Sequence, residues 1–196
     1  LPPKGDKAEL RLPLDKHLLV LQGSGINVQR GAEELVEAMD YLDDCHLMII
    51  GGGDVLPVLK MNVEKKHLED KVSFFPRMSY QNMMAITQLA DLGFTLDKDT
   101  NLNYRFSLPN KIFDYIQAGV PIIASRLPEI ERVISGYDVG CFIEKHDSQI
   151  IADTIKKALS DEKILRTWKN NLTFAALNLC WEKEENVLLA VYSKYI

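Results

Sequence analysis

Short apolar runs alternate along the chain with amphipathic helical patterns. Runs without strict polar alternation are typical of strands buried on both faces. Six such runs occupy residues 17–22, 46–50, 72–75, 92–96, 120–124 and 139–143. Between them, apolar residues recur three and four positions apart, which predicts helices. The alternation predicts an α/β fold: a Rossmann-like, doubly wound parallel sheet of about six strands with helices on both faces.

The two ends of the chain depart from this alternation. Residues 1–16, rich in Pro, Lys and Asp, are predicted to be a lead-in segment, and the chain lacks an initiator Met. We therefore expect the chain to be part of a longer protein. Residues 161–196 show no strand pattern and are predicted to form two terminal helices. The main domain is predicted to span residues 17–196, a length that suits one domain.

Composition narrows the classes of protein further. Of the 196 residues, 46% are apolar and 26% are charged, which excludes a disordered or collagen-like chain. The net charge of -5 argues against a general nucleic-acid surface but permits a local basic pocket. The longest apolar runs are about five residues, far short of a membrane helix. The three cysteines and four histidines are scattered, so we expect no disulfide framework, no metal site and a reducing compartment.

In an open parallel sheet, ligands bind beyond the carboxyl ends of the strands, and the first predicted strand ends in a glycine-rich loop. Gly23, Ser24 and Gly25 follow this strand, and Arg30 stands at the head of the next helix. Free helix N–H groups and a cation suit a phosphate. A tight turn explains the glycines equally well. The spacing matches neither G-x-G-x-x-G nor a P-loop.

The second predicted strand ends in three consecutive glycines. Gly51 and Gly53 bound this run, with Asp54 as the expected N-cap and Pro57 in the first turn of the next helix. A sharp turn is one explanation. Three glycines exceed what a turn needs, which favours a close ligand contact.

Residues 103–125 predict a loop, a helix opened by Pro109 and a strand after Gly119. Asn110 and Asp114 are four positions apart and share a helical face, with Lys111 nearby. A cation and a helix N-terminus suit a phosphate, and a carboxylate suits vicinal hydroxyls. The segment thus favours a phosphorylated sugar ligand over an amphipathic helix with solvated charges.

Taken in order, these motifs resemble the C-terminal, donor-binding half of GT-B glycosyltransferases of group 1 (family 4). The resemblance covers residues 17–196. It rests on the first donor loop, the glycine turn, the loop beside the base and the S-L-P-N-K variant of the donor helix. The corresponding residues are Gly23, Ser24 and Arg30; Gly51 and Gly53; Arg77; and Ser107, Leu108, Pro109, Asn110, Lys111 and Asp114. The first glutamate of the family's motif aligns with Phe106, which cannot accept a hydrogen bond.

The resemblance implies a hexosyltransferase-type enzyme whose substrate is a UDP- or GDP-sugar, with no cofactor. Arg30 and Lys111 would be catalytic by stabilising the departing diphosphate. Asp114 would hold the ribose, and the other residues just named, with Gly25, would contact the donor. An N-terminal acceptor domain would be missing, so this fragment is expected to be inactive alone.

The wider setting also follows from the resemblance. The acceptor would be a saccharide or a lipid-linked acceptor, in bacterial cell-surface polysaccharide synthesis. The expected location is cytoplasmic, with attachment at the inner face of the membrane as an alternative, and no nucleic acid partner is expected. Two other functions stay open: a non-catalytic nucleotide-binding module, for which Phe106 speaks, and a sugar-nucleotide epimerase of the same fold.

Overall fold

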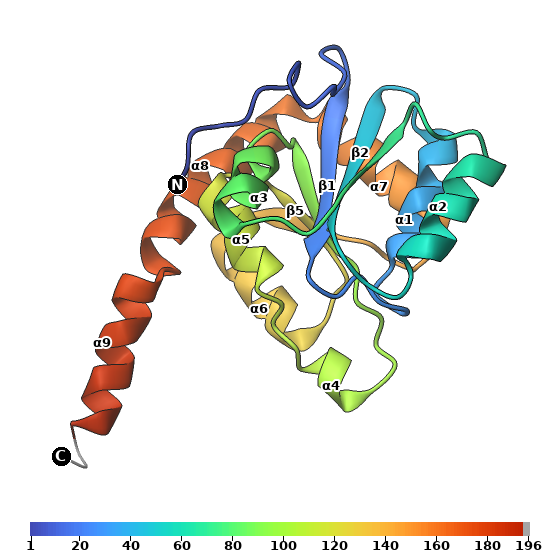
Figure 1. Cartoon of the computed structure of the whole chain (residues 1–196). Helices are drawn as coiled ribbons and strands as arrows, with labels where there is room; N and C mark the ends of the chain where they lie inside the picture. The colour runs from blue at the N-terminus through green and yellow to red at the C-terminus, as the bar shows by residue number, and fades with distance from the viewer. Residues whose placement is uncertain (194–196) are drawn as a thin grey trace.

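The structure, a computed structural model, describes residues 1–193 and contains one parallel sheet of six strands (Figure 1). The strand order is β3-β2-β1-β4-β5-β6. The strands are β1 (His17–Gly23), β2 (Cys45–Gly51), β3 (Val72–Phe75), β4 (Leu92–Thr95), β5 (Ile122–Ala124) and β6 (Gly140–Phe142). Each lies within two residues of its predicted bounds. β5 begins later than predicted because Val120 still donates to the Tyr115 carbonyl at the end of the preceding helix and Pro121 has no N–H.

Helices cover both faces of the sheet, as predicted (Figure 1). Successive strand residues point to opposite faces, so Leu19 and Leu47 join one core while Leu18 and Met48 join the other. One face carries α1 (Ala32–Ala38), the 3-10 turn Met39–Tyr41, α2 (Leu56–Lys65) and α7 (Ser148–Ser160). The other carries α3 (Tyr80–Thr87), α5 (Lys111–Ala118), α6 (Pro128–Tyr137) and α8 (Glu162–Asn178). Burial on both faces explains why the strands are continuously apolar.

The two terminal helices behave differently. In α8, the side chains of Trp168, Leu172 and Ala175 are buried against the domain. α9 (Trp181–Tyr192) extends away from the domain (Figure 1), and no side chain within its bounds is buried. Among residues 1–193, no helix has the length and apolar character to cross a membrane.

The N-terminal segment contacts the domain. Leu12 is buried in the core beneath α3, α5 and α6. The N–H of Gly5 donates to the carbonyl of Ala85 in α3, at 2.9 Å. Part of the predicted lead-in therefore packs as core.

β1 and β4 separate toward their carboxyl ends. They pair only at Leu19–Leu92 and Val20–Gly93. In the sheet, β1 has β2 as its neighbour on one side and β4 on the other. The strand order therefore reverses between β1 and β4. Ligands of doubly wound sheets bind in the crevice at such a switch point.

The hydroxyl of Tyr115, from α5, lies between the separating strands. It accepts from the Gln22 N–H at 3.3 Å and lies 3.2 Å from the Val20 carbonyl and 3.1 Å from the Phe94 carbonyl. The Tyr115 ring needs a glycine beside it, since a Cβ on Gly93 would lie 2.8 Å from the ring. α5 is thereby anchored at the switch point.

Candidate functional site

The glycines after β1 and β2 let two loops of the chain pack against each other. Gly51 has φ +130°, and a Cβ there would lie 1.9 Å from the Gly23 carbonyl oxygen. A Cβ on Gly53 would lie 2.0 Å from the Ile26 carbonyl oxygen. The Ile26 N–H also donates to Gly52, at 2.8 Å. The close contact that the triple glycine predicted is therefore made with the chain itself, which needs no ligand to explain it.

Asp54 differs from its predicted role as a helix cap. The N-cap of α2 is Val55, and Pro57 lies in the first turn as predicted. The Asp54 carboxylate instead accepts the N–H of Val28, at 3.2 Å. It therefore ties the loop after β2 to the loop after β1.

Arg77 lies across the same two loops. Its guanidinium donates to the Ser24 carbonyl at 2.6 Å, and a Cβ on Gly52 would lie 2.4 Å from its Nε. Arg77 and Ser24 are both exposed, and Gly25 is half-buried in the same loop. This group lies on the β3 side of the switch point, because Arg77 follows β3 closely.

Arg30 is paired with a carboxylate that sequence reasoning missed. Its guanidinium donates to Asp97 Oδ1 at 2.8 Å, and Asp97 is fully buried just beyond β4. The other oxygen of Asp97 accepts from the Thr95 hydroxyl at 3.3 Å. The Tyr104 ring centre lies 5.0 Å from the Arg30 guanidinium. Arg30 is thus held from two sides instead of being a free cation.

Lys111 lies beside this pair. Its side chain passes the end of β1, where a Cβ on Gly23 would lie 4.0 Å from Lys111 Cε. Burial lowers the pKa of Lys111, Arg30 lowers it further, and Asp97 raises it. Arg30, Asp97 and Lys111 therefore share one electrostatic environment, which we name the switch-point cluster.

The start of α5 differs from the prediction. The helix begins at Lys111, with Asn110 as an exposed N-cap residue that makes no side-chain cap bond. Pro109 precedes the helix, and its carbonyl accepts from the Ile112 N–H at 3.1 Å. The predicted stop is confirmed, since Gly119 is the C-cap with φ +70°. Phe113, in the first turn of α5, is half-buried.

Asp114 has a hydrogen-bond partner on each carboxylate oxygen. Gln22 Nε2 donates to one at 3.1 Å, and the Tyr80 hydroxyl donates to the other at 3.2 Å. The Thr87 hydroxyl donates to Gln22 Oε1 at 2.5 Å and so fixes which way the Gln22 amide points. Burial raises the pKa of Asp114. Each oxygen can still accept a further hydrogen bond, for example from a ligand hydroxyl.

The loop before α5 contains a short helix, α4 (Leu102–Arg105), which projects beyond the carboxyl ends of the strands (Figure 1). Asn101 caps it by accepting from the Tyr104 N–H at 2.9 Å. The Ser107 hydroxyl donates to the Tyr104 carbonyl at 3.0 Å, while Leu108 packs against the core. Phe106 is 58% exposed.

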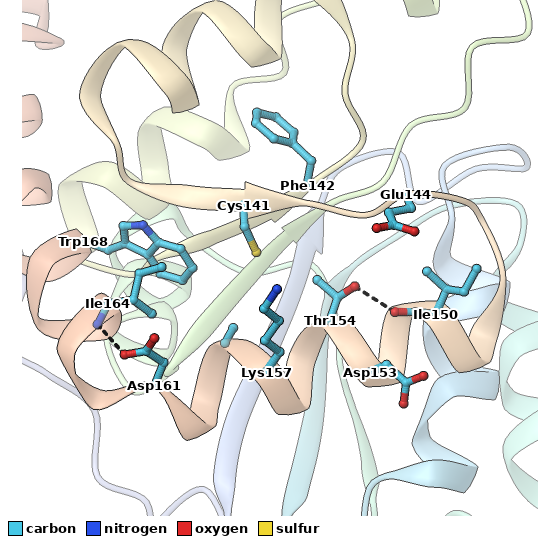
Figure 2. Close-up of a pocket in the computed structure, with 11 residues that line it drawn as sticks. Cys141, Phe142, Glu144, Ile150, Asp153, Thr154, Lys157, Asp161, Ile164 and Trp168 are labelled. Carbon is cyan, nitrogen blue, oxygen red and sulfur yellow. Dashed lines mark hydrogen bonds between the residues drawn. The ribbon is translucent and has the colours of Figure 1, made fainter.

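A separate cavity of about 400 Å³ lies between β6, α7 and α8 (Figure 2). Lys157 points into it toward Cys141 (Figure 2). The Thr154 hydroxyl donates to the Ile150 carbonyl one turn earlier in α7, and Asp161 caps α8 by accepting the Ile164 N–H. None of the predicted site residues lines it. Within residues 1–193, no group of three or more His, Cys, Asp or Glu could hold a metal ion. The candidate site is therefore the group of side chains gathered at the switch point, where ligands of such sheets bind.

The family model described as "Glycosyl transferases group 1" matches residues 6–173. This chain belongs to the group 1 glycosyl transferases. Among curated members, N-acetyl-alpha-D-glucosaminyl L-malate synthase from Bacillus anthracis is 28% identical over 123 residues, which cover 63% of this chain and 30% of that protein.

Solved glycosyltransferase structures share the fold. Sucrose-phosphate synthase from Thermosynechococcus elongatus superposes with a TM-score of 0.84 at 20% identity, covering 100% of this chain and 49% of that one. Anabaena Alr3699/HepE in complex with UDP gives a TM-score of 0.77 at 15% identity, covering 95% and 51%. The chain thus spans about half the length of these two structures and 30% of the length of the glucosaminyl L-malate synthase. The resemblance to the C-terminal half of a group 1 glycosyltransferase with the GT-B fold is confirmed.

Proposed function

We propose that this chain binds the nucleoside diphosphate part of a nucleotide-sugar donor in the switch-point crevice. The observation that carries the proposal is that Arg30, from the loop before α1, lies near Lys111 and Asp114 of α5, which is about 80 residues further along the chain. The cations suit the diphosphate, and the carboxylate suits the ribose hydroxyls. The crystal structure of HepE, which shares this fold, contains UDP, and this supports a nucleoside diphosphate as the ligand class.

In the proposed reaction, the bond between the anomeric carbon of the donor sugar and the diphosphate breaks, and its electron pair stays on the diphosphate oxygen. The anomeric carbon forms its new bond to an acceptor hydroxyl oxygen, which releases its proton to solvent or to the departing diphosphate. Arg30 and Lys111 stabilise this developing charge, which is catalysis by electrostatic stabilisation of a leaving group. We propose that the rest of the nucleotide extends toward Ser24 and Arg77, whose contact supports their acting together. The scheme uses a UDP- or GDP-sugar as substrate and assigns no cofactor or metal to this chain.

The acceptor would bind to another part of the protein, an N-terminal domain that lies outside this chain. The partial coverage of the relatives supports this arrangement. The exposed apolar side chains of α9, such as Trp181, Leu188 and Tyr192, support a contact with that part. We further propose a saccharide or lipid-linked acceptor, in cell-surface polysaccharide synthesis on the cytoplasmic side, with this chain inactive in transfer by itself.

A second candidate is a nucleotide-binding module without catalysis. Phe106 favours it, because an exposed aromatic ring stands where the resemblance places a glutamate. Sugar transfer by the complete protein with an intact Phe106 would remove this candidate.

Calorimetric titration of the chain with UDP, GDP and ADP tests donor binding. We expect one of the three to bind and Lys111→Ala to weaken it, while Lys169→Ala, at an exposed position on α8, serves as the matched control. Absence of binding for all three nucleotides, by this chain and by the complete protein, would refute the proposed function.

A further inference from the structure

We propose that Asp97 is a positioning residue for donor binding, which fixes the direction of Arg30 and supplies the counter-charge for Lys111. This inference rests on the proposed function of the same site. It concerns a residue that would not itself touch the donor. A carboxylate beside an anion site is unexpected, because it would repel the diphosphate.

The geometry of Arg30 supports a positioning role. Asp97 takes one end of the guanidinium at 2.8 Å, and the Tyr104 ring lies against its face at 5.0 Å. These contacts restrict rotation of a long side chain. Among residues 1–193, the buried Nε of Arg30 has no partner. A fixed guanidinium with unused N–H groups suits two-point recognition of a phosphate.

The position of Asp97 explains its burial. A Cβ on Gly31, which has φ +72°, would lie 2.4 Å from Leu96 Cβ. The loop carrying Arg30 therefore packs directly on the residue before Asp97. This contact brings the guanidinium to the carboxylate at the end of β4, where Asp97 has no exposed surface.

Lys111 needs Asp97 for a different reason. Burial and the neighbouring Arg30 both favour its neutral form, and Asp97 opposes them. On its own helix, Asp114 is engaged with Gln22 and Tyr80, and the Tyr115 hydroxyl bonds to the strands. Two neighbouring cations in a half-buried site without a counter-charge are costly, so loss of Asp97 would be relieved by deprotonation of Lys111.

This coupling reverses the result expected from simple electrostatics. If Asp97 only repelled the donor, Asp97→Asn would tighten nucleotide binding at every pH. If it positions the two cations, the variant loses the Lys111 charge as pH rises. The association constant of the variant, divided by that of the native chain, should then fall as pH rises. The variant should bind as tightly as the native chain, or more tightly, only at the acidic end of the range.

The test measures the affinity of the nucleotide that the native chain binds, UDP, GDP or ADP, from about pH 6.5 to about pH 9, where an unperturbed lysine stays protonated. The ionisation of free nucleotide cancels in the ratio of the two proteins. We expect the ratio for Asp97→Asn to fall several-fold across this range, because the protonated fraction of Lys111 declines as pH rises through its pKa. Asp99→Asn, an exposed neighbour paired with Arg105, should show a constant ratio.

Two further measurements make the outcome decisive. With Lys111→Met as the background, adding Asp97→Asn should no longer introduce a pH dependence. Nitrogen-15 NMR of the Lys111 ammonium, without nucleotide, should show a lower titration midpoint in the variant. Asp97→Ser, a smaller polar residue, replaces Asp97→Asn if the latter does not fold.

A ratio that stays constant with pH, or tighter binding by Asp97→Asn throughout, overturns the inference while leaving the proposed function intact. Failure of the native chain and of the complete protein to bind any nucleotide overturns both. These two failures are therefore distinguishable.

Discussion

The hydroxyl of Tyr115 joins the two strands that separate at the switch point, and its removal is the sharpest test of how this site is built. Tyr115→Phe deletes one oxygen and keeps the fully buried ring in place against Gly93. The hydroxyl accepts from the Gln22 N–H and donates to one of two carbonyls, those of Val20 and Phe94. Substitution therefore leaves a buried N–H and a buried carbonyl each short of a partner.

The size of the effect follows from these lost bonds. A buried polar group left unsatisfied costs about 1–3 kcal/mol. The expected loss in free energy of unfolding for Tyr115→Phe is about 2–3 kcal/mol, or roughly 4–12 °C in melting temperature for a domain of this size. Burial raises the pKa of Tyr115, so its hydroxyl stays protonated and the loss should not vary across neutral pH.

Thermal and urea unfolding followed by circular dichroism measure this loss. Tyr137→Phe is the matched control, because Tyr137 is half-buried and packs its ring 6.2 Å from that of Phe174. Nucleotide affinity should also fall for Tyr115→Phe, since α5 carries Lys111 and Asp114. A destabilisation below about 0.5 kcal/mol, the size typical of surface changes, would refute the argument that the hydroxyl bridges the strands.

Three other substitutions test the electrostatics. Lys111→Ala should weaken nucleoside diphosphate binding by about 1–3 kcal/mol, the value of a charge-assisted hydrogen bond, and unchanged affinity by calorimetry would contradict this. Burial raises the pKa of Asp114, so the stability linked to its protonated form is present at low pH and lost as pH rises through that pKa. Asp114→Asn should therefore raise the melting temperature at pH 7 relative to the native chain, with the gain shrinking toward acid pH. It should also weaken a nucleoside diphosphate more than inorganic diphosphate, and equal losses would exclude the ribose role. Burial lowers the pKa of His46, so stability linked to its neutral form should be lost as pH falls below about 6.5. His46→Gln should flatten that slope in urea titrations, and an unchanged slope would place its origin elsewhere.

The sheet could be predicted because its strands are buried on both faces. Continuous apolar runs such as 46–50 need no partner information to be recognised, and the helical spacing between them predicts the parallel topology. The helix starts were harder. Pro109 has the right chemistry for a first helical position, yet it lies just before α5. Its carbonyl accepts the Ile112 N–H in the turn that leads into the helix.

The site was only partly predictable. Lys111 and Asp114 were found because they lie on one helix, where spacing determines which side chains are neighbours. Asp97 was not found, because Lys98 and Asp99 follow it and the sequence of this segment is typical of an exposed charged loop. One signal was available: Asp97 is the second residue after β4, at the edge where ligands bind. Its burial depends on a contact between Leu96 and Gly31, which are distant in sequence.

The switch-point cluster reconciles two opposing demands on the crevice. Anion binding calls for cations, while a folded chain is destabilised by buried cations that have no counter-charge. Arg30 and Lys111 alone would carry two positive charges in a half-buried site, and the Asp97 carboxylate offsets part of that charge. In the proposed donor site, the remaining positive charge would attract a diphosphate. The glycine contacts hold together the loop that carries Arg30 and its neighbours, and Lys111 passes beside Gly23. The glycines, which first suggested a ligand contact, would therefore serve binding through the positions of Arg30 and Lys111.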